Sequence, residues 1–163
     1  MFTEELAATI EALVTPGKGI LAADESTNTI GKRLKTINVE NTEENRKKYR
    51  DLLFTTPGLN NYINGVILFE ETLGQTSKDG TPFAELLMNQ GIVPGIKVDK
   101  GLVELAGTDG EKVTEGLDGL KQRLKGYKAQ GARFAKWRNV ISISDTQPTL
   151  TTIKAGAENL ARY

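Results

Sequence analysis

The sequence predicts an α/β fold in which parallel strands alternate with helices. Three observations support this: short apolar runs lie near residues 20, 66, 96 and 134, helical patterns separate them, and charged residues follow each run. Strand–helix alternation is typical of parallel βα units. A (β/α)8 barrel carries its chemistry at the carboxyl ends of its strands, where these charged residues fall. A doubly wound sheet also binds ligands there and is the alternative, although no Gly-x-Gly-x-x-Gly follows the first run.

The first half of the chain is predicted to contain three helices and two strands. Apolar residues at helical spacing predict a helix over 3–14, and an apolar run predicts a strand over 20–23. Acidic residues in a first turn favour a helix over 41–54. A second strand is predicted over 66–69 and a short helix over 83–89. Both strands are expected to be fully buried, because they are apolar at almost every position.

The second half is predicted to contain two further strands and two further helices. A strand lies within 95–101, and a Gly-rich stretch without a predicted element covers 105–116. Leucines at helical spacing predict an amphipathic helix over 117–127, whose lysine-bearing face is expected to be solvated. The fourth strand is predicted over 132–140, and a last helix over 144–163.

The predicted strand count is half of what a barrel needs. A full barrel has eight strands in about 250 residues, whereas this chain has 163 residues and four predicted parallel strands. The outer strands of a half barrel would expose unpaired edges. We therefore expect either that the sequence is part of a longer chain or that the missing strands come from elsewhere.

Composition excludes several classes of function. The chain has 21 Lys+Arg and 21 Asp+Glu, no His and no Cys. Zero net charge argues against a dedicated nucleic-acid binder, and the missing residue types exclude disulfides, a thiol nucleophile and a Ser-His-Asp triad. No apolar run approaches the ~20 residues that span a bilayer, and the acidic N-terminal segment does not resemble a signal peptide. No zinc site of the usual kind is possible without Cys and His, and we expect a soluble intracellular protein.

Four cations gather near the ends of the third and fourth predicted strands: Lys97, Lys100, Lys136 and Arg138. A lysine amine can attack a carbonyl to form a Schiff base, and clustered cations can hold a phosphate. The residues alone also allow scattered, solvated charge at these positions. Trp137 lies between two of the cations and is expected to point away from them into core packing.

A carboxylate and a group of hydroxyls follow the first strand. Asp24 is a candidate general base, and the alternative is that it caps the segment after it. Ser26 and Thr29 offer hydroxyls to a phosphate, and Lys32 and Arg33 are expected in the same loop. The acids after the second strand, Glu70-Glu71, are expected to form caps or salt bridges rather than to act in chemistry.

The motifs together resemble class I fructose-1,6-bisphosphate aldolase over the whole chain. The matching segments are GKGILAADESTNTIGKRL, NVENTEENRKKYRDLLFTT, GVILFEETL, GIKVDKG, TEGLDGL, GARFAKWR and ENLARY. The resemblance implies a TIM (β/α)8 barrel of which this chain covers about the first four βα units. It further implies that residues 1–163 are the N-terminal half of one domain, with no internal boundary.

The resemblance assigns roles residue by residue. Asp24 resembles the aspartate that takes part in proton transfer and orients the substrate, and Lys136 the lysine that assists carbinolamine and carbon–carbon bond chemistry. The phosphate-binding positions implied are Ser26, Thr29, Lys32, Arg33, Lys97 and Arg138. The family's Schiff-base lysine lies on the sixth strand and its main glutamate acid/base on the fifth, outside this chain. The segment alone is therefore expected to be inactive.

The resemblance also implies partners and a location. The substrates would be fructose 1,6-bisphosphate and triose phosphates, with no cofactor or metal, no nucleic acid and no membrane. The full-length protein would be a homotetramer in the cytoplasm, with the plastid stroma as the other compartment. A non-catalytic half-barrel binding or scaffold protein is the alternative function, and a relative acting on another phosphorylated substrate is a third.

Overall fold

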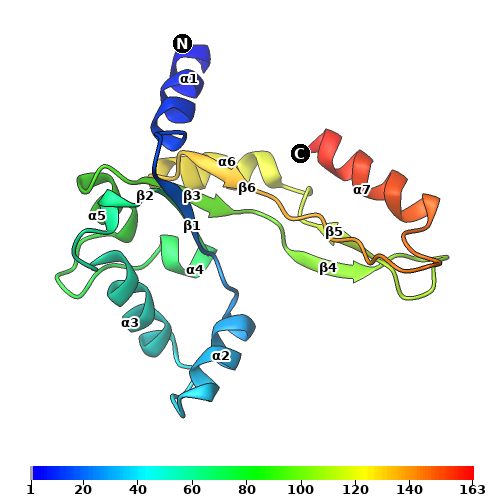
Figure 1. The fold of residues 1–163 in the computed structure, drawn as a ribbon, viewed down its shortest axis with the longest axis horizontal. Coiled ribbons are helices and arrows are strands. Elements are labelled where there is room, and N and C mark those ends of the chain that lie inside the picture. Colours follow the sequence, from blue (N-terminus) through cyan, green and yellow to red (C-terminus); the bar gives the residue numbers. More distant parts are fainter. Residues whose placement is uncertain (1) are drawn as a thin grey trace. The chain divides into compact units, whose positions relative to one another are not determined.

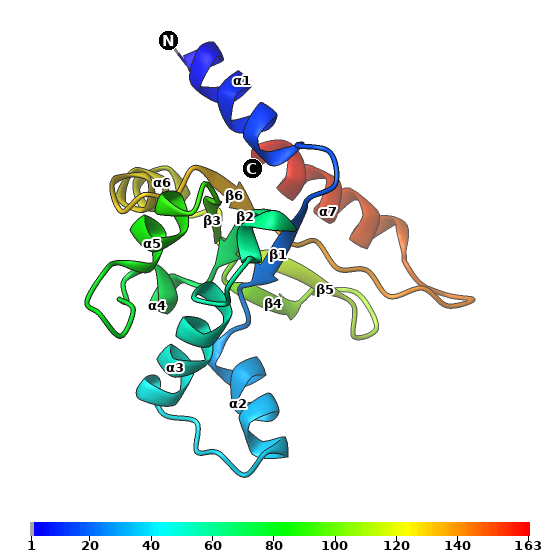
Figure 2. The ribbon, with the colours of Figure 1, turned by 60° about the vertical axis from the view of Figure 1, so that its left-hand side comes forward.

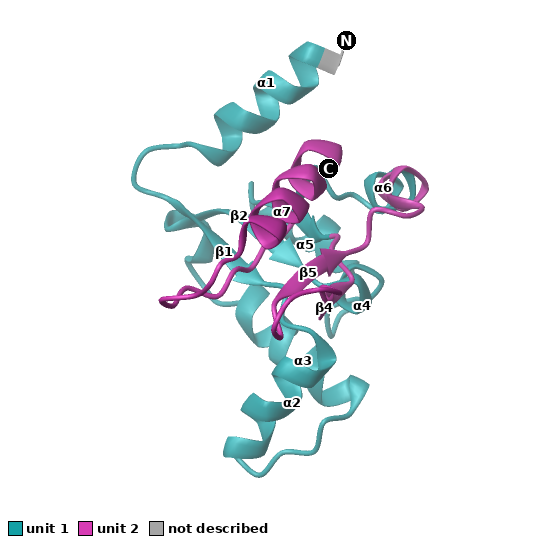
Figure 3. Cartoon of the chain, turned by 90° about the vertical axis from the view of Figure 1, so that its right-hand side faces the viewer, with its two compact units in different colours: residues 1–97, 125–135 teal, residues 98–124, 136–163 magenta. Residues whose placement is uncertain are grey.

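The computed structural model describes residues 2–163, which form two compact units. The first unit takes in the chain up to Lys97 together with 125–135, and the second comprises 98–124 and 136–163 (Figure 3). The expectation of a single domain over 1–163 stays a prediction.

Helices and strands follow one another in the order drawn in Figure 1. They are α1 (Phe2–Leu13), β1 (Gly19–Ala23), α2 (Thr27–Thr36), α3 (Glu43–Phe54), the 3-10 turn η1 (Leu59–Asn61), β2 (Ile63–Leu68), α4 (Glu70–Leu73), α5 (Phe83–Asn89), β3 (Val93–Lys97), β4 (Gly101–Glu104), β5 (Lys112–Glu115), α6 (Leu120–Ala129), β6 (Phe134–Lys136) and α7 (Leu150–Arg162). The four predicted parallel strands correspond to β1, β2, β3 and β6.

The main sheet has the strand order β1-β2-β3-β6. β1 pairs with β2 in parallel, and β2 with β3, as the sequence predicts. β2 and β3 are largely buried, but Ile20 in β1 is 47% exposed and Ala22 is also exposed. The prediction that the first strand is fully buried is therefore wrong, because β1 is an edge strand with a neighbour on one side only.

The C-terminal end of helix α1 contacts the amino end of the sheet, while Leu6 and Ile10 earlier in the helix are exposed. Asn64 Nδ2 donates a hydrogen bond to the Leu13 carbonyl at 2.8 Å. A Cβ built on Gly65 would lie 2.6 Å from Leu13 Cδ2, so a larger residue there would force the Leu13 side chain to shift. α1 joins one end of β1 and α2 follows the other end (Figures 1 and 2). The carboxyl end of β1, where the candidate residues begin, is thus away from α1.

The segment 26–33, predicted as a loop, forms most of helix α2. Ser26 is its N-cap, with its hydroxyl accepting from the Thr29 amide. Ile30 and Leu34 lie one turn apart and are buried, which gives the helix an apolar stripe. The two apolar positions are too few to stand out as a period in the sequence. The cap also shows that the capping role considered for Asp24 belongs to Ser26.

A hairpin covers residues 101–115, and its connection and second strand lie in the glycine-rich stretch that was predicted to have no element. β4 and β5 pair antiparallel, with Gly101 opposite Glu115 and Glu104 opposite Lys112. Gly107 and Gly110 in the connection have φ values of 80° and 70°. Such positive values suit glycine in a turn. Each strand has only four residues, so its alternation is too short to be recognised in the sequence.

Helix α7 begins at Leu150, six residues after the predicted start. Thr149 is its N-cap and accepts a hydrogen bond from the Thr152 amide. The Ser144 hydroxyl instead accepts from the Gln147 amide at 3.1 Å, which closes a tight loop before the helix. The prediction placed the start of the helix at Ser144 instead of after Thr149, because serine and threonine are both residue types that cap helices. Within the second unit, α7 packs against β5.

A buried carboxylate fixes the start of α7. Glu111 is 2% exposed, and its carboxylate accepts from the Thr149 amide at 2.9 Å and from the Thr149 hydroxyl at 2.6 Å. The hydroxyl bond is the main cause that lowers the pKa of Glu111 below 4.5. The ionised carboxylate is therefore favoured in the folded state over the unfolded chain.

We expect Glu111→Gln to make the protein less stable at neutral pH. A lowered folded pKa contributes stability above the unfolded pKa and loses it as the pH falls through the folded value. The difference between the wild type and Glu111→Gln in urea midpoint should therefore close as the pH falls below 4.5. Glu104→Gln, an exposed change in the same hairpin, is the control and should show little difference at any pH. A difference for Glu111→Gln that grows in acid would contradict the assignment.

No helix within residues 2–163 has the length and apolar character needed to cross a membrane.

Candidate active site

The sheet brings two of the predicted residues to one edge. The strand register aligns Ala23, Leu68 and Ile96, and these three side chains are buried. Asp24 and Lys97 each come one residue later, so they lie at the carboxyl edge and point to the opposite face. They are two strands apart, a backbone separation of about 10 Å. Both are half-buried, which leaves part of each side chain accessible to a ligand.

Two predicted phosphate-binding hydroxyls meet at the start of α2. The Ser26 and Thr29 hydroxyls are 3.1 Å apart, and Ser26 Oγ accepts from the Thr29 amide at 3.4 Å. The free backbone N–H groups and the dipole of a helix N-terminus favour an anion at this position. A phosphate role for these two hydroxyls stays a prediction.

Arg33 lies on the second turn of α2 and is already bound within the first unit. It forms an ion pair with Glu25 and donates to the Tyr49 hydroxyl at 3.2 Å. The hydrogen bond with Tyr49, together with the charge of Glu25, raises the pKa of Arg33. Its side chain is 57% exposed, so part of the guanidinium remains accessible. A phosphate role for Arg33 stays a prediction.

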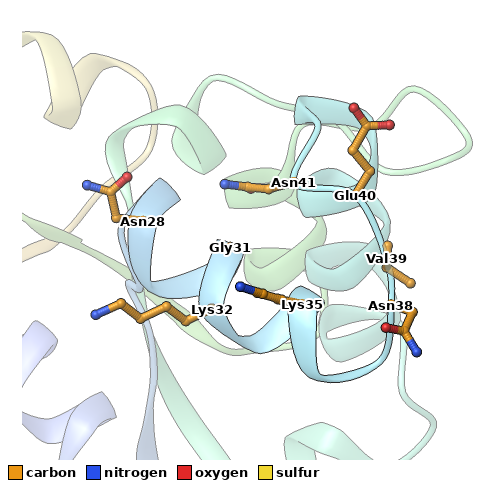
Figure 4. A pocket seen from close by; sticks show the side chains of 8 residues that line it. All are labelled: Asn28, Gly31, Lys32, Lys35, Asn38, Val39, Glu40 and Asn41. Carbon is orange, nitrogen blue, oxygen red and sulfur yellow. The ribbon is translucent and has the colours of Figure 1, made fainter.

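Lys32 lines an open groove between α2 and the segment that follows it (Figure 4). The groove has a volume of about 820 Å³, and its lining residues are Asn28, Gly31, Lys32, Lys35, Asn38, Val39, Glu40 and Asn41. A Cβ on Gly31 would lie 2.4 Å from Asn41 Nδ2, so the two segments meet closely there. Neither Ser26 nor Thr29 lines this groove. The structure thus associates Lys32 with the groove rather than with the two hydroxyls.

Lys136 and Arg138 belong to the second unit. The carbonyl of Lys136 accepts from the Val98 amide at 3.1 Å, and the carbonyl of Arg138 accepts from the Thr114 hydroxyl at 2.7 Å. The Lys136 side chain is half-buried and that of Arg138 is exposed. Backbone bonds thus hold this segment within its unit, and convergence with Asp24 and Lys97 stays a prediction.

Trp137 has the packing role expected of it. Its ring stacks on Tyr163 at the end of α7, with centroids 5.4 Å apart and an interplanar angle of 29°. The contact lies wholly within the second unit. It provides a structural reason for an aromatic residue between two cations.

Both acids after β2 form structural contacts, and Glu71 forms a salt bridge of the predicted kind. Glu71 binds Arg46 through two hydrogen bonds, of 2.8 Å from Nε and 2.6 Å from Nη2. The Glu71 hydrogen bond raises the pKa of Arg46. Glu70 accepts from the Tyr127 hydroxyl at 2.6 Å. Both carboxylates are therefore occupied by side chains of the first unit.

A buried arginine was missed in the sequence. Arg50 in α3 is 2% exposed and binds Glu25, the residue between Asp24 and Ser26. Its four-residue spacing from Arg46 places both guanidinium groups on one helix face, and this spacing was the available signal. Nothing in the sequence indicated that Glu25 is the partner, since 25 residues separate the two.

The groups at this edge can bind an anion and transfer a proton. A carboxylate can move a proton, an ammonium can hold an anion, and hydroxyls at a helix N-terminus can bind phosphate oxygens. Within residues 2–163, no cluster of three or more acidic side chains is arranged to hold a metal ion.

Comparison with known proteins gives consistent matches along the chain. The sequence model of the family described as "Glycolytic: Fructose-bisphosphate aldolase class-I" matches residues 5–163. The chain is 61% identical over 162 residues to the cytosolic fructose-bisphosphate aldolase 6 of Arabidopsis thaliana, covering 99% of this chain and 45% of that protein. It is 59% identical over 162 residues to fructose-bisphosphate aldolase 1 of Caenorhabditis elegans, covering 98% and 44%.

A solved structure matches as well. Fructose-bisphosphate aldolase from Plasmodium falciparum, in complex with TRAP and a small-molecule inhibitor, superposes with a TM-score of 0.95 at 59% identity. The match covers 98% of this chain and 47% of that one. The chain thus spans less than half the length of these relatives. The match confirms the predicted fold class, part of a barrel of alternating strands and helices.

Proposed function

The chain belongs to the class-I fructose-bisphosphate aldolase family, and from this premise we propose that the protein containing it cleaves fructose 1,6-bisphosphate reversibly. The products are dihydroxyacetone phosphate and glyceraldehyde 3-phosphate. The observation that supports this most directly is that Asp24 and Lys97 follow aligned strand residues at one edge of the sheet, while the Ser26 and Thr29 hydroxyls meet at the start of α2, shortly after Asp24. This edge has the charges and donors that a sugar bisphosphate requires.

In this proposal the chain contributes two catalytic residues. Asp24 orients the substrate hydroxyls and takes part in proton transfer. Lys136 assists formation of the carbinolamine and the carbon–carbon bond step. A carboxylate and an ammonium can carry these roles without a metal ion.

Phosphate binding is divided among hydroxyls and cations. Ser26 and Thr29 hold phosphate oxygens at the start of α2, where the helix dipole favours an anion. Lys97 and Arg138 supply positive charge to a phosphate. Lys32 and Arg33, on the same helix as Thr29, contribute to the basic surroundings.

The reaction itself proceeds through a Schiff base on a lysine outside this chain. That amine adds to the C2 carbonyl and water leaves, which forms a protonated imine. The C4 hydroxyl loses its proton, the C3–C4 bond breaks, and its electron pair enters the iminium to give an enamine. Protonation of the enamine at C3 and hydrolysis release dihydroxyacetone phosphate and restore the lysine.

Lys97→Met is expected to weaken binding of a non-cleavable hexitol 1,6-bisphosphate about 10- to 150-fold. A hydrogen bond to a charged group contributes about 1.5–3 kcal/mol, and about 1.4 kcal/mol corresponds to tenfold. Isothermal titration calorimetry on the full-length protein measures the change. Lys121→Met, which removes an exposed lysine of α6, is the matched control and should bind as the wild type does. Equal loss in both variants would indicate non-specific electrostatics and contradict the assignment.

The proposed function is tested by assaying the protein expressed from its complete reading frame. Fructose 1,6-bisphosphate should yield both triose phosphates, and activity should persist after treatment with a chelator. Borohydride added with dihydroxyacetone phosphate should inactivate the protein by reducing the imine. Failure to release triose phosphates, or loss of activity to the chelator alone, would refute the proposal.

The proposal extends to partners and location. Relatives named cytosolic or cytoplasmic support a cytoplasmic protein, and we propose a homotetramer for the full-length form. Light scattering of the full-length protein measures the subunit number. A non-catalytic half-barrel binding protein is not favoured, because the matched relatives are named aldolases.

A further inference from the structure

We propose that Arg50, paired with Glu25, is a positioning residue that holds the junction between β1 and α2 in the geometry needed by Asp24 and Ser26. This inference rests on the proposed function, since it concerns the same site. Arg50 itself does not need to touch substrate. It acts through the main chain of the residue that stands between the two site residues.

One guanidinium binds both the side chain and the backbone of Glu25. Arg50 Nη1 donates to Glu25 Oε2 at 2.5 Å, and Nη2 donates to the Glu25 carbonyl at 3.0 Å. The arginine is 2% exposed, and the Glu25 side chain is 10% exposed. Two bonds from one rigid planar group fix both the position and the orientation of this residue.

The same carboxylate links the junction to a second helix. Arg33 of α2 pairs with the other oxygen of Glu25 and also donates to the Tyr49 hydroxyl of α3. The Arg50 guanidinium lies 5.3 Å from the centroid of the Tyr49 ring. The residue after Asp24 is thus held by α2 and α3 together.

The ion pair between Arg50 and Glu25 is better suited to positioning the junction than to stabilising the fold. Withdrawing two charges from water costs several kcal/mol per ion, so a buried ion pair adds little stability compared with apolar packing. What the pair does provide is direction, because its hydrogen bonds require one arrangement of the junction. Small displacements of substrate-positioning groups reduce turnover strongly, by about 100-fold for 1 Å.

Arg50→Lys is the test, performed in the full-length protein. Lysine keeps the charge but cannot bind the carboxylate and the carbonyl in the same fork geometry. We expect kcat for fructose 1,6-bisphosphate to fall about 10- to 100-fold. Amide hydrogen exchange should become faster in the segment 24–29. Phe54→Leu, a core change one turn along α3, is the control for general destabilisation and should keep kcat and exchange in this segment close to the wild type.

The outcomes separate this inference from the proposed function. Equal kcat and equal exchange at 24–29 in Arg50→Lys and Phe54→Leu would overturn the positioning role while leaving the function intact. Faster exchange at 24–29 in a protein whose wild type does not cleave the sugar would refute the function and retain the positioning role. If Arg50→Lys does not fold, Glu25→Gln replaces it. That variant keeps an acceptor oxygen but removes the charge. We expect a smaller fall in kcat and a smaller rise in amide exchange at 24–29. Unchanged kcat and unchanged exchange would overturn the inference.

Discussion

Replacement of Asp24 by asparagine is expected to lower kcat for fructose 1,6-bisphosphate by ~10²–10⁴-fold in the full-length protein. Asparagine has nearly the same shape but cannot accept and return a proton. Asp24 lies directly after β1 at the carboxyl edge of the sheet and is half-buried, so the change keeps its volume while removing the chemistry. The initial rate of triose phosphate release at saturating substrate measures the effect.

The control for this prediction is Asp79→Asn. Asp79 is exposed in the turn before α5, and its loss should leave kcat within error of the wild type. Urea midpoints of both variants should remain near that of the wild type, which separates chemistry from folding. A kcat for Asp24→Asn within about threefold of the wild type would show that Asp24 takes no part in proton transfer, since general acid–base catalysis contributes ~10²-fold or more.

Replacement of Phe54 by alanine is expected to cost ~3–5 kcal/mol of folding stability. Phe54 is 0% exposed, and its ring meets that of Phe83 edge to face, with centroids 5.2 Å apart. Removing the ring takes away buried apolar surface and leaves a cavity between α3 and α5. The Phe54 carbonyl also accepts from Gln90 at 2.9 Å, so the end of α3 is tied to the same region.

Leu52→Ala is the matched control for this core change. Leu52 lies in the same helix but is 68% exposed, so its loss should change stability by no more than about 0.5 kcal/mol. Urea unfolding of the full-length variants, followed by tryptophan fluorescence and circular dichroism, measures both. Equal midpoints for the two variants would show that α3 does not pack through Phe54 as the structure has it.

The elements that could be predicted are those with a complete local signal. The pattern over 41–54 places acidic residues in a first turn, and α3 (Glu43–Phe54) lies within it and ends at the predicted residue. The apolar run at 66–69 marks β2, whose position in the middle of the sheet buries most of it. For these two elements local propensity and tertiary environment agree, so the sequence is sufficient to predict them.

The errors arise where tertiary contacts decide. Helix α2 is stabilised by burial of Ile30 and Leu34 rather than by a long periodic pattern, and the hairpin depends on pairing across a turn. The exposure of Ile20 follows from the edge position of β1, which strand patterns do not specify. Each of these features depends on what the segment contacts, which its own residues do not encode.

In the candidate site, too, some features could be predicted from local sequence and others could not. Asp24 and Lys97 were predicted from their position at strand ends, and the parallel register places them at one edge. The contact between Arg50 and Glu25 was not predictable, because it joins residues from two elements that meet only in the folded unit. The end of a strand can be recognised from nearby residues, whereas the buried contacts that orient it join residues far apart in the sequence.

The most direct test of the account is a crystal structure of the full-length protein with a non-cleavable hexitol 1,6-bisphosphate. Phosphate oxygens should lie within hydrogen-bond distance of Lys97 and of the Ser26 hydroxyl, with Asp24 against the sugar hydroxyls. A sugar bound elsewhere, for example in the groove beside Lys32 and Lys35 with this edge unoccupied, would contradict it.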